Sequence, residues 1–125
     1  MAEKGDYEAA ESEYKKALAQ DPNCERALEA LAVNYILQAQ NIKEASVQIT
    51  DRQKQVANDE KAIKFYEASL PPLEKYTELL RSRDASESEK QSALLKLRNV
   101  YYNLSNMGID KSTEMEAVEK ELNLN

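Results

Sequence analysis

The segment between Pro22 and Pro71 constrains the fold most, because it contains neither glycine nor proline. Gly and Pro are the strongest helix breakers, and the whole chain of 125 residues has only two Gly and three Pro. Apolar residues recur along this segment at seven-residue intervals, at Leu28, Tyr35, Ile42 and Ile49 and then at Val56, Ile63 and Leu70. A seven-residue repeat is typical of long helices that pack along a seam. The sequence therefore predicts two long helices that form an antiparallel hairpin.

The turn of this hairpin has no Gly or Pro to mark it. Two polar segments are candidates, Thr50–Lys54 and Ala57–Asp59. We favour Thr50–Lys54, because a turn there gives two arms of similar length.

Pro71 and Pro72 interrupt the second arm of the hairpin. Two adjacent prolines remove two helical hydrogen bonds and clash with the preceding turn. Ser69 is a candidate cap for a helix that restarts after them. The sequence therefore predicts a kink or a break in the helix near Pro71–Pro72.

Shorter helices flank the hairpin on both sides. A helix over residues 6–20 is expected to end before Pro22, which disfavours helical geometry at the residue preceding it. A second helical pair is expected over 86–123. Its first helix begins at Ser86, which has capping-box spacing to Glu89, and ends near Gly108.

The composition excludes most catalytic chemistry. The chain has no His and one Cys, so it has no Ser-His-Asp or Cys-His machinery, no His-ligated metal and no internal disulfide. Cys24 has no reactive partner near it in sequence and is expected to be a passive thiol. We therefore predict that the chain is not an enzyme and uses no cofactor or metal.

The charge and hydropathy also exclude whole classes of partner. A net charge of −6 argues against nucleic acid and against an anionic membrane surface, since both require a basic face. No segment approaches the length of a membrane span, so no membrane insertion is expected. We predict a soluble protein, either cytoplasmic or periplasmic if an export signal lies outside this sequence.

Residues 5–35 resemble a tetratricopeptide repeat, a family built of helix pairs about 34 residues long. The motif of the family's second helix is matched by Gly5, Asp6, Tyr7, Ala10, Tyr14, Ala17, Leu18, Asp21, Pro22 and Asn23. The first helix of the next repeat is matched by Leu28, Leu31, Ala32 and Tyr35. The resemblance implies an all-α, right-handed superhelix of about five helices in a single domain, 1–125. Its parts would be the second helix of a repeat (6–20), an elongated pair (23–83) and a degenerate C-terminal pair (86–123).

The pattern departs from the family after Tyr35, where an insertion lengthens both helices of the second pair. With its elongated penultimate hairpin, the chain resembles a bacterial subgroup of the family. That subgroup also carries segments like Gln48–Asp51 and Leu70–Lys75. Members of that subgroup are often exported and largely uncharacterised.

The chain begins with the second helix of a repeat, which leaves the stacking face of that helix uncovered. We expect the chain to be the C-terminal part of a longer superhelix, or its first helix to be covered by a partner or a second copy. Repeat proteins need polar caps because their stacking faces are apolar. We therefore predict weak self-association through the N-terminal end.

The resemblance also implies where a partner would bind. Tetratricopeptide arrays bind peptides or partner helices on the concave surface formed by the first helix of each pair. That surface would include Arg26, Glu29, Val33, Ile36, Leu95, Arg98, Tyr102 and Ser105. Arg98 beside Tyr102 would hold a carboxylate or stack on a ring. The family's carboxylate clamp is not supported, because Ala30 and Val33 stand where Asn is expected.

The function predicted from the sequence is thus a non-catalytic scaffold that binds a protein or peptide. The alternative is structural self-assembly through the long hairpin or through the uncapped N-terminal helix. The burial of Ile42, Ile49, Val56 and Ile63 distinguishes the scaffold function from self-assembly. These residues are either buried inside the hairpin or left exposed.

Overall fold

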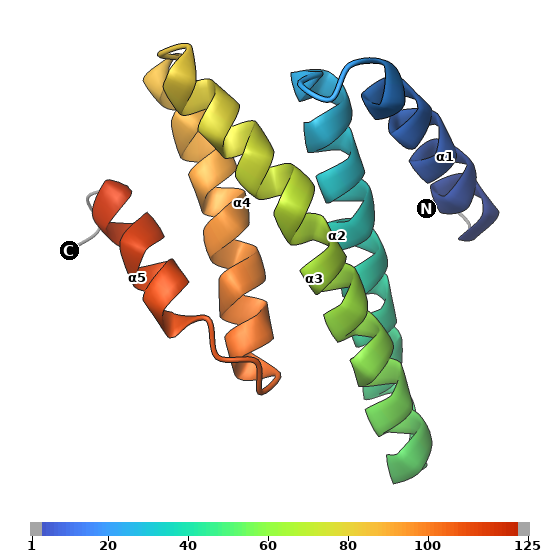
Figure 1. Cartoon of the computed structure of the whole chain (residues 1–125). Helices are drawn as coiled ribbons and strands as arrows, with labels where there is room; N and C mark the ends of the chain where they lie inside the picture. The colour runs from blue at the N-terminus through green and yellow to red at the C-terminus, as the bar shows by residue number, and fades with distance from the viewer. Residues whose placement is uncertain (1–3, 123–125) are drawn as a thin grey trace.

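The computed structural model describes residues 4–122, and it confirms that the chain is all-helical. Its five helices are α1 (Lys4–Gln20), α2 (Glu25–Val47), α3 (Arg52–Ser82), α4 (Glu87–Asn106) and α5 (Ser112–Glu121). Each helix packs against the next along the chain, with the most extensive contact between α2 and α3 (Figure 1).

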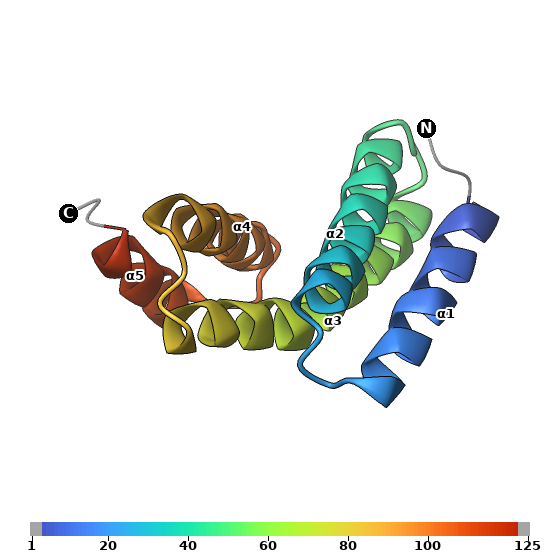
Figure 2. The same ribbon diagram turned by 90° about the horizontal axis from the view of Figure 1, so that it is seen from above.

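The helices lie in two layers. Seen from above, α2 and α4 form one layer and α1, α3 and α5 form the other, and α3 lies beneath both α2 and α4 (Figure 2). The lower halves of α2 and α3 project beyond α1 as an arm, and the turn end of α3 lies below the end of α4 (Figure 1). The expected long antiparallel hairpin is therefore present.

The hairpin turns at residues 48–51, between the end of α2 and the start of α3. Asp51 determines where α3 begins, because its Oδ1 accepts a hydrogen bond from the Lys54 backbone N–H at 3.1 Å. The turn overlaps the favoured segment Thr50–Lys54 only in its first two residues. The other candidate, Ala57–Asp59, lies inside α3.

The predicted kink or break near Pro71–Pro72 is confirmed only as a kink, because α3 bends in its middle but continues through both prolines as one helix (Figure 2). Buried residues on either side, Leu70 and Leu73, hold the two halves in the core, while Pro71 itself is exposed. Ser69 starts no new helix. Its buried hydroxyl donates to the Tyr66 carbonyl oxygen at 2.6 Å. The two prolines remove the N–H donors to two carbonyls, and the axis of α3 changes direction in its middle (Figure 2).

The main core spans the upper part of the molecule, where α3 packs between α2 and α4. Its fully buried large side chains are Tyr66, Leu73, Leu80, Val100 and Leu104. The inner face of α4 is buried as well, and it consists of Leu94, Leu97, Val100, Tyr101 and Leu104. Their spacing of one, three and four residues is typical of the core face of a helix.

Two predicted helix ends are also confirmed. The Ser86 hydroxyl accepts a hydrogen bond from the Glu89 backbone N–H at 3.2 Å, so Ser86 caps α4. Gly108, just after α4, has a φ of 96°, a left-handed conformation that favours glycine.

Replacing Pro72 with Ala tests how α3 tolerates its prolines. The change restores a backbone N–H that can donate to the Ala68 carbonyl, and it removes the ring clash. We expect Pro72→Ala to raise the free energy of unfolding by about 1 kcal/mol, since the helical gain exceeds the added entropy of the unfolded chain. Chemical denaturation measures this change. Glu67→Ala, an exposed substitution in the same turn, serves as the control and should have little effect. A loss of stability on Pro72→Ala would show instead that the prolines shape the packing of α3.

Candidate functional site

A groove of about 550 Å³ runs between α2 and α4. Its apolar lining residues are Val33, Ile36 and Leu37 from α2 and Leu95 from α4. The groove exists because α3 packs behind both helices and keeps them side by side (Figure 2). Two polar contacts link α2 to α4 directly. Lys43 Nζ donates to Asn103 Oδ1 at 2.9 Å, and Lys96 Nζ lies 3.9 Å from Glu29 Oε2.

Leu37 and Leu95 are the exposed apolar residues of this groove. Leu37 is 42% exposed on the α2 wall and Leu95 is 50% exposed on the α4 wall. Val33 is half-buried and Ile36 is buried, so they form the base of the α2 wall. Two large apolar side chains are thus left accessible on the two sides of one groove.

The rest of the lining is polar and almost free of charge. Amide and hydroxyl side chains come from Gln40, Ser88, Gln91, Ser92 and Asn99. Of the described residues that line the groove, Lys96 alone is charged, although charged residues make up 32% of the chain. A ligand in this groove would therefore contact hydrogen-bonding and apolar groups and would experience little electrostatic field.

Three of the residues predicted to bind a partner come together in this groove, namely Val33, Ile36 and Leu95. Glu29 lies beside it, near Lys96. Tyr102 is 53% exposed on the same face of α4 as Leu95, because residues seven apart share a helix face. Arg26 is exposed in the first turn of α2. These six residues lie on or near one surface of the molecule.

The structure places the other two predicted residues against α5. Arg98 Nε donates to Glu119 Oε2 at 3.0 Å. The carboxylate that Arg98 was expected to hold is therefore that of Glu119 in the same chain. The Ser105 hydroxyl accepts a hydrogen bond from the Lys111 backbone N–H at 3.0 Å. Both side chains thus attach the C-terminal segment to α4, and neither lines the groove.

Sequence reasoning missed Leu37 and the amide and hydroxyl residues of the groove. The signal was present, since Leu37 lies four residues after Val33, and Ser88, Ser92 and Asn99 share a face with Leu95. These residues were missed because Gln, Ser and Asn on a helix are usually solvated and carry no chemical signature of a site.

A second hollow, of about 530 Å³, lies between α1 and α2 and also borders Val33 and Leu37. Tyr7 and Tyr14 line it from α1, and both are half-buried. α1 is held in place in part by Asn34, whose Nδ2 donates to the Tyr7 carbonyl oxygen at 3.1 Å. The stacking face of α1 is therefore covered in part by α2.

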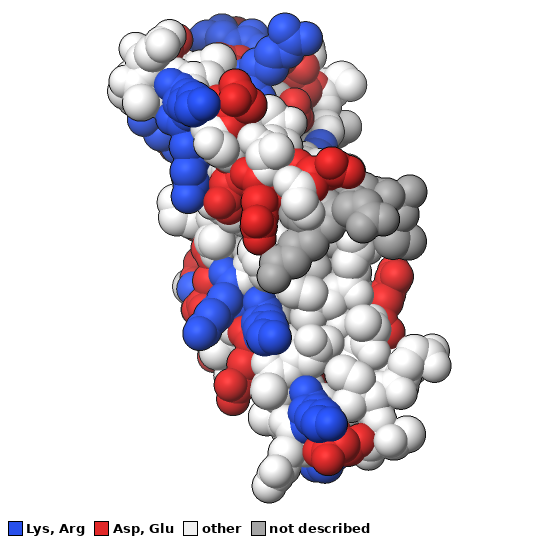
Figure 3. Space-filling view, turned by 90° about the vertical axis from the view of Figure 1, so that its right-hand side faces the viewer, with Lys and Arg blue, Asp and Glu red and all other residues white. Residues whose placement is uncertain are grey.

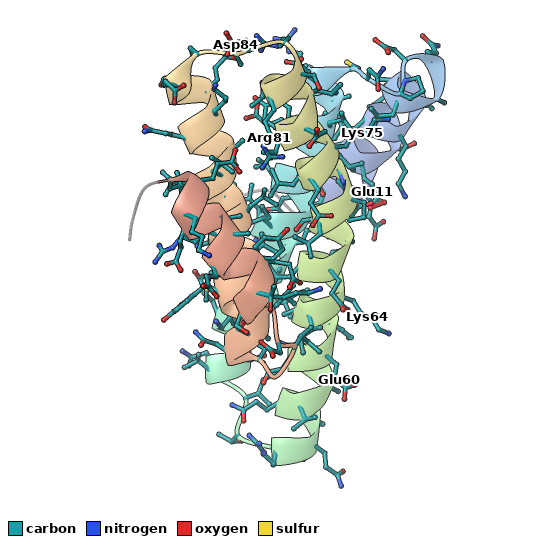
Figure 4. The ribbon with its side chains drawn as sticks, turned by 60° about the vertical axis from the view of Figure 1, so that its left-hand side comes forward. Glu11, Glu60, Lys64, Lys75, Arg81 and Asp84 are labelled. Carbon is teal, nitrogen blue, oxygen red and sulfur yellow. The ribbon has the colours of Figure 1, made fainter. Side chains whose placement is uncertain are left out.

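Several groups with shifted pKa values lie between α3, α4 and α5, away from the groove. Burial, together with a hydrogen bond to Glu74 Oε2 at 2.6 Å, raises the pKa of the Tyr101 hydroxyl. Arg81 points toward α5 (Figure 4) and donates to both carboxylate oxygens of Glu121, which lowers the pKa of Glu121. The first pair thus joins α4 to α3, and the second pair joins α3 to α5. Residues 4–122 contain no group of three or more Cys, Asp or Glu side chains arranged to hold a metal ion.

Comparisons with protein-family models, with curated proteins and with solved structures found no match for this chain. None of the helices in residues 4–122 combines the length and the apolar character that a membrane span requires.

Replacing Arg98 tests its placement against α5. Arg98→Ala removes the contact with Glu119 but leaves the groove lining intact. We expect amide hydrogen exchange in Ser112–Glu121 to become about two- to fivefold faster, because partly exposed ion pairs contribute only fractions of a kcal/mol. Lys120→Ala, which removes an ion pair within α5 itself, is the matched control. Unchanged exchange in α5 after Arg98→Ala would contradict the assignment.

Proposed function

We propose that this chain is a non-catalytic interaction module that binds a segment of a partner protein in the groove between α2 and α4. The observation that supports this most is the exposure of Leu37 and Leu95 on its two walls. Exposed apolar patches with a polar rim mark interaction sites on soluble proteins. The ligand is a peptide or a helix whose apolar side chains cover both leucines.

The partner docks against helices that are already formed, so this chain loses little conformational entropy on binding. Burial of one leucine contributes about 1.5–3 kcal/mol, and two leucines together support only a moderate affinity after the cost of association. The amide and hydroxyl side chains of the groove then contribute specificity, because a poorly matched polar ligand would leave them unpaired.

We further infer that the five helices form a tetratricopeptide-like right-handed superhelix. The motif residues between Gly5 and Tyr35 support this, as does the alternation of helices between two layers (Figure 2). A protein partner fits better than nucleic acid, because the net charge is −6 and the groove offers a single lysine.

Peptides selected from a random-peptide phage library on the wild-type chain provide the probe for this function. We expect Leu95→Glu to weaken binding of the selected peptide by at least about tenfold, since it places a charge against an apolar contact. Fluorescence polarisation with the synthetic peptide measures the affinity. Val56→Glu, at an exposed apolar residue far from the groove, is the matched control and should bind like the wild type. Equal binding by wild type and Leu95→Glu would reject the groove as the site.

Self-assembly through the arm is the second candidate function, favoured by two exposed valines near the turn. Val47 is 76% exposed and Val56 is 39% exposed. The isoleucines that distinguish the two functions, Ile42, Ile49 and Ile63, are half-buried. The arm therefore leaves a small apolar surface at its end.

Sedimentation equilibrium tests this alternative. If the end of the arm pairs with a second copy, Val47→Asp should shift the chain to monomer, because an aspartate would be buried at the contact. Thr50→Asp, at an exposed residue in the same turn, is the control. A wild-type chain that stays monomeric at high concentration would exclude assembly through the arm and also through α1.

A further inference from the structure

A third hollow, of about 390 Å³, lies where the N-terminal end of α1 meets the arm. It is distinct from the groove between α2 and α4, because it is lined by other residues of α2 together with α1 and α3. α1 ends part-way down α2, and the hairpin continues below it (Figure 1). The elongation of the hairpin therefore creates this hollow.

Three side-chain amides line the hollow, from Gln38 and Asn41 on α2 and Asn58 on α3. Hydrogen bonds within the protein fix two of them. Asn58 Nδ2 donates to the Ile42 carbonyl oxygen at 2.9 Å, and a backbone carbonyl can only accept, so the orientation of this amide is determined. Asn34 likewise donates to the Tyr7 carbonyl, so its own oxygen accepts from Gln38 Nε2 at 2.7 Å.

The third amide, Asn41, donates through Nδ2 to the Tyr7 hydroxyl oxygen at 3.0 Å. All three amides thus use their nitrogens within the fold, and among the described residues no donor reaches their oxygens. The hydroxyl proton of Tyr7 and the ammonium group of the exposed Lys61 add donors at the same hollow. The hollow therefore offers both acceptors and donors to a ligand.

The remaining lining residues, Ile42 and Phe65, are apolar and half-buried. The Phe65 ring packs against Tyr35, with 6.2 Å between ring centroids and 35° between planes. This contact fixes the position of the Phe65 ring. Within residues 4–122 no carboxylate lines the hollow, although the chain has 23 acidic residues. Figure 3 shows that much of this face of the arm is uncharged.

We propose that this hollow binds a polyhydroxylated ligand, a carbohydrate of one or two rings. Hydroxyl groups both donate and accept, which matches amide oxygens beside a phenol and an ammonium group. The apolar face of a sugar ring matches Phe65 and Ile42. A cationic ligand would be repelled by Lys61 and would find no carboxylate among the described lining residues. The volume lies in the range of small-molecule sites.

The test is NMR on the ¹⁵N-labelled full chain with maltose, cellobiose and chitobiose as probes. We expect saturation transfer to the ring protons of at least one disaccharide, with shifts of the side-chain amide signals of Gln38, Asn41 and Asn58. Asn41→Leu should weaken that binding by about tenfold, the scale of one lost hydrogen bond. Gln53→Leu, at an exposed amide elsewhere on the arm, is the matched control and should bind like the wild type.

Several outcomes would overturn the proposal. One is no saturation transfer with any of the three disaccharides, and another is shifts confined to residues outside the hollow. Binding of a neutral Ala-Gly heptapeptide at the same amides, without binding of a disaccharide, would assign the hollow to a peptide backbone instead. The wild-type shift map decides the matter even if Asn41→Leu fails to fold, and none of these results depends on the groove between α2 and α4.

Discussion

The burial of one face of α3 between α2 and α4 is the interaction on which the rest of the structure depends. Tyr66, Leu73 and Leu80 on this face are almost completely buried, and they contact both neighbouring helices through one continuous core. Because α3 fills the space behind α2 and α4, these helices lie side by side without packing closely against each other. The groove is therefore a consequence of how α3 is buried. It is lined by the faces of α2 and α4 that α3 does not reach.

The same helix changes character along its length. Its upper half is held by apolar packing, whereas near the turn α2 and α3 are joined by amide side chains. Gln55 and Asn58 both donate to backbone carbonyls of α2, and Asn58 also donates to the buried Ser46 hydroxyl at 2.8 Å. Such hydrogen bonds contribute little net stability but make any other register costly, because these half-buried amides would lose their partners. This explains how a polar arm keeps a defined pairing.

The sequence predicted most of the fold because helix boundaries and core faces depend on local chemistry. Ser86 and Gly108 act within a single turn, so their roles could be read from their neighbours. The continuity of α3 through Pro71 and Pro72 could not be read from neighbouring residues. It depends on tertiary burial of Leu70 and Leu73, which outweighs the local cost of the prolines. Backbone chemistry alone predicted a kink or a break at these two residues, and α3 bends there without a break (Figure 2).

The candidate site was predicted less completely, for a related reason. Periodicity identified the exposed faces of α2 and α4, but Arg98 was assigned to the groove because no local signal shows that Glu119 lies within reach. The ion pairs of the C-terminal part, including Arg81 with Glu121, attach α5 to the opposite side of the core. Charged residues are thus used to hold the helices, and the surface between α2 and α4 is left nearly neutral. A ligand there is selected by shape and hydrogen bonding, so its affinity should depend only weakly on salt.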